Sequence, residues 1–274
     1  MERRRDFLLT DEPAPGIERL AAHFDGYAYD PHRHETYAIG VTLAGAQEFR
    51  YRGADCVSST GQVMVLHPDE EHDGHAAAPD GFSYRMLYVD PTLIREALDP
   101  EFENISDLPF VPEVVSEDRV LAASVDDAFA GFPGPFDPLA AEAVIAGLAD
   151  ALARRAKLRR RGGALPRRAV AQVRALLDAE YARPIGSGDL ERVAGLDRFS
   201  LARAFRTAFG TAPHRYLIAR RVAAARRLIA GGAPLAEAAD ACGFADQSHL
   251  NRHFKACMGV TPGRYARLIA RQAA

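Results

Sequence analysis

The sequence lacks any run of about 18 apolar residues, the length that a helix needs to cross a bilayer, so a membrane span is not expected. Only three cysteines occur among the 274 residues, Cys56, Cys242 and Cys257, and no two of them stand at metal-ligand spacing. Few, scattered cysteines favour a reduced compartment. The N-terminal MERRRDFLLTDEPAPG continues with acids and prolines rather than an apolar stretch, so we expect a cytoplasmic protein that is not exported.

Lysine is absent from the first 153 residues. This is one sign of a strong charge asymmetry between the two halves of the chain. Residues 1–153 hold 10 arginines against 29 acidic residues, a net charge of −19. Residues 154–274 hold 24 basic residues against 8 acidic ones, a net charge of +16. A chain divided in this way usually places its basic half on a polyanion, whereas phosphates would repel the acidic half. The alternative, that the two halves merely attract each other, stays open at this point.

Short runs of alternating polar and apolar residues fill positions 24–90. They include TYAIGVTLAG, QEFRYRG, QVMVLHP and FSYRMLYVD, and glycine and aspartate separate them. Period-two runs joined by tight turns predict antiparallel strands that close into a sandwich or a barrel.

Helical spacing replaces this alternation after Asp90. PTLIREAL begins with proline in a first helical turn, and residues 117–130 and 137–158 carry apolar residues at helical intervals. In the last segment five residues can share one apolar stripe, which fits either a core or a dimer contact: Leu139, Val144, Leu148, Leu152 and Leu158. The next segment, RRRGGALP at 159–166, is typical of a linker.

Two segments of the basic half repeat each other, namely residues 189–210 and 237–259. A glycine, an apolar residue and then Leu-x-Arg-x-x-Phe recur in both, which indicates one structural unit used twice. The matched pairs are Gly195 with Gly243, Leu201 with Leu250, Arg203 with Arg252, Phe205 with Phe254 and Gly210 with Gly259.

Each repeat has the features of a helix-turn-helix unit. A short helix ends at the first glycine, the next apolar residue fills the corner, and Asp197 or Asp246 caps a second helix. Arginine reads guanine bidentately, and glutamine or asparagine reads adenine. The residues expected to face outward, either toward DNA or as an ordinary solvated face, are Arg198, Phe199, Ala202, Arg203 and Arg206 in the first unit and Gln247, Ser248, Asn251, Arg252 and Lys255 in the second. Arg206 and Lys255 are better placed for phosphates.

The segment PHRYLIARRVAAARRLIA, residues 213–230, predicts one helix that begins with proline and ends before two glycines. A helix of 18 residues is roughly 27 Å long. A rod of that size can hold two reading helices about one turn of DNA apart, so that both enter successive major grooves.

At these residues the chain resembles the AraC-type transcription regulators, over residues 167–269 and most closely over CGFADQSHLNRHFKACMGVTPGRYAR. The resemblance implies seven helices, two helix-turn-helix units on a linker helix, and activation or repression at promoters. It also places base contacts on Phe199, Ala202, Arg203, Gln247, Ser248, Asn251 and Arg252. The chain departs from the family pattern at Ser187 and Glu191, where a leucine and a small alanine are usual. We therefore expect Glu191 to face solvent or to disturb the helix crossing, and Gly186 and Gly188 to weaken the helix start.

Residues 31–90 resemble the cupin-like sensor domain of many AraC-type regulators, through PHRHETYAIGVTLAG, YRG, GQVMVLHPDEEHDG and GFSYRMLYVDP. Metal-binding cupins add a glutamate after His-x-His, but that position falls here at Ala38 or Ile39, and neither can bind a cation. No metal or other cofactor is therefore predicted. The candidates for an organic-ligand pocket, which fit turns and wall packing equally well, are His32, His34, Tyr37, Tyr51, His72, Tyr84 and Arg85.

Together these patterns predict an α+β protein of two domains. Residues 1–158 form a cupin-like antiparallel β-barrel with trailing helices, and residues 167–274 form an all-α domain with two helix-turn-helix units on a linker helix. The expected function is sequence-specific binding of double-stranded DNA under control of an unknown small-molecule effector, with a homodimer and RNA polymerase as further candidate partners. Two alternatives stay open: a metal-dependent cupin enzyme with a DNA-binding tail, and a regulator whose barrel is only a scaffold.

Overall fold

The computed structural model describes residues 6–99, 108–136, 139–159 and 164–270. The chain divides into two compact units, residues 1–136 with 144–163, and residues 137–143 with 164–274. Residues 137–143, which the sequence assigned to the first domain, group with the second unit. Part of the predicted linker, residues 160–163, lies outside the described residues. Within the described ranges, no helix combines the length and apolar character needed to span a bilayer.

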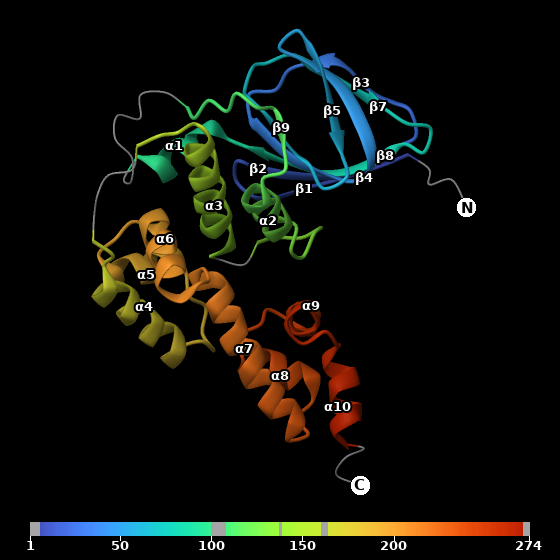
Figure 1. The fold of residues 1–274 in the computed structure, drawn as a ribbon. Coiled ribbons are helices and arrows are strands. Elements are labelled where there is room, and N and C mark those ends of the chain that lie inside the picture. The colour runs from blue at the N-terminus through green and yellow to red at the C-terminus, as the bar shows by residue number, and fades with distance from the viewer. Residues whose placement is uncertain (1–5, 100–107, 137–138, 160–163, 271–274) are drawn as a thin grey trace. The chain divides into compact units, whose positions relative to one another are not determined.

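Antiparallel strands form the first unit, as the alternating runs over residues 24–90 predicted, and two further strands precede those runs (Figure 1). The strands are β1 (Phe7–Ala14), β2 (Ile17–Phe24), β3 (Tyr27–His32), β4 (Tyr37–Tyr51), β5 (Ala54–Ser59), β6 (Val63–Leu66), β7 (His72–Ala76), β8 (Phe82–Val89) and β9 (Val115–Ser116). One path of paired strands runs β1-β2-β8-β4-β6-β9, while β3 pairs with β7 and both β5 and β7 pair with β4. Because β4 is 15 residues long, it belongs to both sheets of the unit.

Three helices accompany these strands: α1 (Pro91–Leu98), α2 (Arg119–Ala128) and α3 (Ala140–Arg155). They correspond to the segments with helical spacing after Asp90. Asp90 accepts a hydrogen bond from the Thr92 amide at 2.8 Å and so caps α1, and Asp118 caps α2 in the same way. An α+β protein of two domains is therefore confirmed.

Side chains alternate along β2 and β8, and one row of them faces the core between the sheets. Leu20 of β2 lies opposite Met86 of β8, and both are buried in one cluster. Two residues further along, the same row continues with Glu18 opposite Tyr88. Because alternate side chains share a face, Glu18 lies on the core side of the sheet, at the end of the row.

The opposite face of β2 holds Arg19, whose side chain is fully buried. Its guanidinium donates to the carboxylate of Asp11 at 2.8 and 2.6 Å and to the Ala128 carbonyl at 2.6 Å. The rings of Phe132 and Phe136 lie 5.3 and 5.0 Å from its central carbon. A buried charge is tolerated only when it is paired this fully, so Arg19 joins the β1–β2 hairpin to the end of α2.

In residues 164–270 the second unit shows the seven expected helices. They are α4 (Arg167–Ala179), α5 (Ser187–Ala194), α6 (Arg198–Phe209), α7 (Pro213–Ala230), α8 (Leu235–Ala241), α9 (Gln247–Met258) and α10 (Pro262–Ala270). Helix α7 has the predicted bounds. Gly195 and Gly243 adopt left-handed backbone angles, with φ of 65° and 75°, where the first helix of each pair ends.

Each half of the unit has its own core around the repeated residues. Leu201 and Phe205 of α6 are 2% and 0% exposed, and both Leu250 and Phe254 of α9 are 0% exposed. The first pair packs in a cluster with α4, α5 and α7, and the second pair packs with α7 and α8. The repeat in the sequence is therefore a repeat of buried positions.

Glu191 has a role that the sequence did not predict. Its side chain is half-buried, and its Oε1 accepts a hydrogen bond from the Arg198 amide at 2.7 Å. Asp197 accepts hydrogen bonds from the Phe199 and Ser200 amides, each at 3.0 Å. Three of the first four amides of α6, which have no partner inside the helix, are thus satisfied by two carboxylates.

The start of α5 is stabilised in a similar way. Asp189 accepts hydrogen bonds from the Gly186 amide at 3.3 Å and from the guanidinium groups of Arg183 and Arg192 at 3.1 and 3.2 Å. These bonds offset the helix-weakening effect expected from Gly186 and Gly188.

The loop between α4 and α5 contacts both α7 and the turn of the second helix-turn-helix pair. Arg221 of α7 is buried and donates to the carbonyls of Tyr181 and Arg183, at 2.8 and 2.9 Å, in the loop between α4 and α5. In the turn of the second pair, Gly243 approaches the same loop so closely that a Cβ there would lie 2.5 Å from the Ala182 carbonyl oxygen. The spacing of the two pairs on α7 is therefore set by backbone contacts.

Gly243→Ala should destabilise the second unit more than Gly259→Ala. Both glycines have left-handed backbone, with φ of 75° and 73°, where alanine costs about 1–2 kcal/mol. Only at Gly243 would the new Cβ also clash with backbone, since nothing lies within 4 Å of it at Gly259. We expect Gly243→Ala to lower the free energy of unfolding by about 2–5 kcal/mol, measured by urea denaturation. An equal loss of unfolding free energy in the two variants would contradict the close approach of Gly243 to the Ala182 carbonyl.

Candidate nucleic-acid interface and ligand cavity

Helix α9 presents an open polar face. Asp246 accepts a hydrogen bond from the His249 amide at 2.7 Å and fixes where the helix begins. The buried Leu250 and Phe254 then set which side faces outward. On that side the predicted contact residues lie together, with Gln247, Ser248, Arg252 and Lys255 exposed and Asn251 half-buried.

Helix α6 differs from this. The expectation that all five of its candidate residues face outward is wrong for three of them, because Phe199, Ala202 and Arg203 are only 3–4% exposed. Arg198 and Arg206 are half-buried. The predicted roles of these residues in DNA binding remain predictions, but their surroundings differ from those on α9.

Residues 139–143 of the same unit account for part of this burial. Arg206 donates a hydrogen bond to the Ala143 carbonyl at 3.2 Å. Glu142 and Ala143 also line a small hollow together with Arg198 and Ala202. Base reading by Ala202 would therefore require these contacts to separate.

In the first unit, three of the predicted ligand residues come together. The ring centres of His32 and His72 lie 4.4 Å apart, those of His34 and His72 4.8 Å apart, and those of His32 and His34 6.2 Å apart. Each Nδ1 lies within 3.0 Å of a main-chain carbonyl oxygen, so each donates its hydrogen there. Each Nε2 is then a hydrogen-bond acceptor, and that of His34 is buried without a partner among the described residues.

The environment keeps two of these rings neutral. Burial lowers the pKa of His34 below its ordinary value of 6.5 and lowers the pKa of His72 to about 4. Repulsion from a protonated neighbour acts in the same direction, because His32 faces both rings. At neutral pH the cluster therefore carries lone pairs rather than positive charge on these rings.

The other predicted ligand residues divide into two groups. Tyr84 faces the interior and shares a 2.7 Å hydrogen bond with Tyr29, beside a hollow of about 30 Å³. Tyr37 donates to the Pro109 carbonyl at 3.0 Å, and the Tyr51 hydroxyl accepts from the His67 amide at 2.9 Å, so both belong to the packed core.

Arg85 lies outside this cluster. It forms an ion pair with Asp126 of α2 at 3.2 Å and stacks on Phe129. The prediction that Arg85 belongs to the pocket is therefore wrong, because alternation along β8 places it on the opposite face from Tyr84 and Tyr88.

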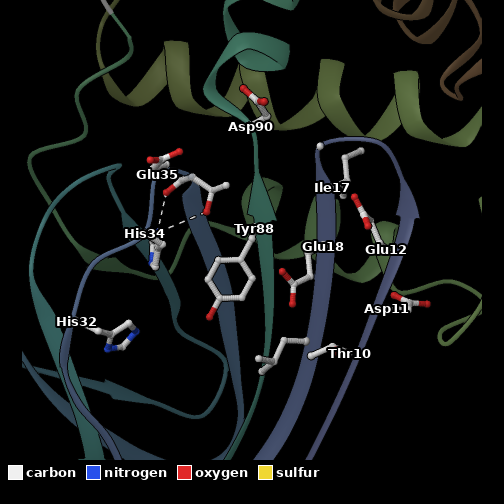
Figure 2. A pocket seen from close by; sticks show the side chains of 13 residues that line it. Thr10, Asp11, Glu12, Ile17, Glu18, His32, His34, Glu35, Tyr88 and Asp90 are labelled. Atoms are coloured by element: carbon white, nitrogen blue, oxygen red, sulfur yellow. Dashed lines mark hydrogen bonds between the residues drawn. The ribbon is translucent and has the colours of Figure 1, made fainter.

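A cavity of the first unit lies at the end of the core rather than inside it. Its volume is about 700 Å³, and Figure 2 shows the side chains around it. The lining residues come from β1, the β1–β2 turn, β2, the end of β3, the loop after β3, β8 and the cap of α1: Thr10, Asp11, Glu12, Gly16, Ile17, Glu18, Leu20, His32, His34, Glu35, Thr36, Tyr88 and Asp90. Among the described residues, no group of three or more His, Cys, Asp or Glu side chains is arranged to hold a metal ion.

The sequence reasoning missed the acidic residues and the tyrosine of this cavity. Glu18 and Tyr88 could have been found from strand alternation, since Leu20 and Met86 are apolar and the same row reaches a charged residue two positions on. Glu12 lies in β1 where the pairing with β2 is interrupted, and Glu35 lies in the loop after β3, and no pattern in the sequence marks either of them.

The first unit should lose stability as the pH falls from about 6.5 to about 4. Burial lowers the pKa of both His67 and His72 to about 4 in the folded state, so in this window the unfolded chain binds protons that the folded chain does not. This contribution is complete above pH 6.5 and is lost as the pH falls to 4. Between pH 6.5 and pH 4, the free energy of unfolding measured with urea should fall by on the order of 2 kcal/mol less in His72→Asn than in the parent protein. An unchanged pH profile would contradict the burial of that imidazole.

Two family models match the chain. One is described as an AraC-like ligand binding domain and matches residues 14–149, and the other is described as a helix-turn-helix domain and matches residues 190–268. The first model covers β2 to β9 and the part of the cavity lining that follows β1, and the second covers α6, α7, α8 and α9.

Individual proteins give similar matches. An uncharacterized HTH-type transcriptional regulator, YbfI of Bacillus subtilis, is 24% identical over 240 residues, which is 86% of this chain and 87% of the relative. A putative AraC-like transcription regulator of Streptomyces lividans is 36% identical over 97 residues, covering 35% of this chain and 32% of the relative. The solved DNA-binding domain of AdpA in complex with a target DNA is 29% identical and covers 38% of this chain and 94% of that one, with a TM-score of 0.36.

Proposed function

The chain belongs to the AraC-type transcription regulators, and from that premise we propose that α9 and α6 read the bases of a promoter while a small molecule bound in the first unit controls this binding. The outward face of α9 is the observation that carries the proposal. Arg252 is suited to guanine, Gln247 and Asn251 are suited to adenine, and Lys255 stands one turn further on, where a phosphate would lie.

For α6 we propose base contacts by Phe199, Ala202 and Arg203, with Arg198 and Arg206 near phosphates. These contacts form once residues 139–143 separate from the helix. The junction of Arg221 and Gly243 with the α4–α5 loop supports simultaneous reading, because it holds both helix pairs in one spacing on α7. A rod of 18 residues, roughly 27 Å long, suits successive major grooves on one face of the duplex.

Control by an effector requires that the ligand binds one arrangement of the protein better than another. The cavity beside His34 and Tyr88 supports a binding role for the first unit. We also propose RNA polymerase and a second copy of this chain as partners, and a reduced, cytoplasmic compartment, which fits the three unpaired cysteines.

A thermal-shift screen of the full-length protein distinguishes effector control from the alternative in which the first unit is only a scaffold. Under effector control, a narrow class of compounds should raise the unfolding temperature and change the affinity for DNA. A screen without any hit, or with unrelated hits that leave DNA binding unchanged, would favour the scaffold.

Arg252→Ala should weaken binding to the specific site by about 1–3 kcal/mol and relax the choice of base at one position. The reason is the loss of a bidentate contact to a base edge, while the phosphate contacts remain. Affinity for the selected site and for a scrambled duplex, measured side by side at one salt concentration, checks this. Unchanged specific affinity would show that this residue does not read a base.

Lys255→Ala is the matched variant on the same helix. If Lys255 contacts a phosphate, specific and scrambled duplexes should lose affinity alike, and the slope of log K against log salt should fall by about 0.9. Affinity titrations at several salt concentrations measure this slope. A loss confined to the specific duplex would contradict the phosphate role.

A further inference from the structure

We propose that the cavity of the first unit takes a small organic cation, such as an amine, an amidine or a guanidine with an apolar body. The inference names the ligand class for the proposed effector control and so rests on that function. It follows from the chemistry of the cavity lining, which offers hydrogen-bond acceptors and negative charge (Figure 2).

Negative charge in the cavity has no counterpart within the lining. Five carboxylates line the cavity, and no arginine or lysine is among the described lining residues. Two of the five have structural tasks, since Asp11 pairs with Arg19 and Asp90 caps α1. The other three, Glu12, Glu18 and Glu35, form no hydrogen bond or ion pair within the described part of the chain.

A buried acceptor gives a second, independent indication of a missing donor. His34 lines the same cavity, and its Nδ1 hydrogen is used by the Thr36 carbonyl at 2.9 Å. Its Nε2 is left as an acceptor, fully buried and without a partner among the described residues. A buried acceptor without a partner is unfavourable, so a ligand that donates an N–H here gains a contact that water does not supply.

Tyr88 provides an aromatic surface between these groups. Its ring lies 5.2 Å from that of His34 and stands opposite Glu18 in the strand register, so that in Figure 2 it lies between the two. Burial raises the pKa of the Tyr88 hydroxyl above its ordinary value, and the nearby negative charge of Glu18 raises it further. A cation beside Glu18 can therefore contact the face of this ring as well as the carboxylate.

Other ligand classes fit the same lining less well. An anion would face the three uncompensated carboxylates, inside a half of the chain with a net charge of −19. A neutral alcohol can donate to Nε2 of His34 but leaves the carboxylates without a counter-charge. A cationic donor matches both the negative charge of the carboxylates and the free acceptor of the imidazole.

Three compounds with one skeleton test the charge directly: phenethylamine, 2-phenylethanol and phenylacetate. Their binding to the full-length protein is measured by calorimetric titration near physiological salt. Phenethylamine should bind at least about tenfold more tightly than 2-phenylethanol, and phenylacetate should not bind. Comparable affinity for the alcohol or the acid would overturn the proposal. So would the absence of binding by phenethylamine, agmatine and spermidine up to about 10 mM.

Glu18→Gln locates the site, and Asp80→Asn is its matched control, because Asp80 is an exposed carboxylate outside the cavity lining. Glu18→Gln should weaken binding of the amine about tenfold, while Asp80→Asn should leave it unchanged. Equal urea midpoints without ligand show that both variants fold. Equal affinity of Glu18→Gln and the parent protein for the amine would overturn the assignment to this cavity.

A DNA-binding measurement separates this inference from the proposed function. If the amine binds in a Glu18-dependent way but DNA affinity stays the same, the ligand class stands and effector control by this site fails. If instead a neutral or anionic compound binds the first unit and changes DNA affinity, effector control stands and the cationic class is wrong.

Discussion

The helical domain depends on the main chain of the α4–α5 loop, which is approached by a buried side chain of α7 and by the turn of the second helix-turn-helix pair. The guanidinium of Arg221 reaches from α7 to the carbonyls of Tyr181 and Arg183, and Gly243 admits the Ala182 carbonyl where a larger residue would not fit. A buried guanidinium that loses its acceptors is strongly unfavourable, so these contacts form or break together. The relative placement of the two pairs is therefore a property of the folded domain, and DNA binding need not order it first.

The second helices of the two helix-turn-helix pairs, α6 and α9, differ in how accessible they are. Helix α9 carries its polar residues on an open face, whereas residues 139–143 lie against α6 and engage Arg206. Under the proposed function, a molecule that stabilises the separation of these contacts would favour DNA binding by both helices, and one that stabilises the contacts would favour binding through α9 alone. Such a molecule can shift the balance only by as much as it prefers one of the two arrangements.

Strand alternation explains why the candidate ligand site was predicted only in part. His32, His34 and His72 were predicted as ligand residues because imidazole groups often bind ligands, and the fold does bring the three rings together. Tyr37 and Tyr51 are equally reactive but use their hydroxyls within the core. Whether a tyrosine lines a cavity or fills a core depends on the strands that lie opposite it, and a single sequence does not specify that pairing.

The sequence by itself determined the local features of this protein. Gly195 and Gly243 end their helices because left-handed backbone suits glycine, Asp197 and Asp246 cap the next helices, and apolar spacing defines residues 213–230 as one helix. Each of these effects acts between residues a few positions apart. Tertiary structure alone decided the partner of Glu191, the burial of Arg203 and the packing of His34 against Tyr88. In each case the decisive neighbours arrive through helix crossings or strand register, which sum many weak contacts over the whole domain.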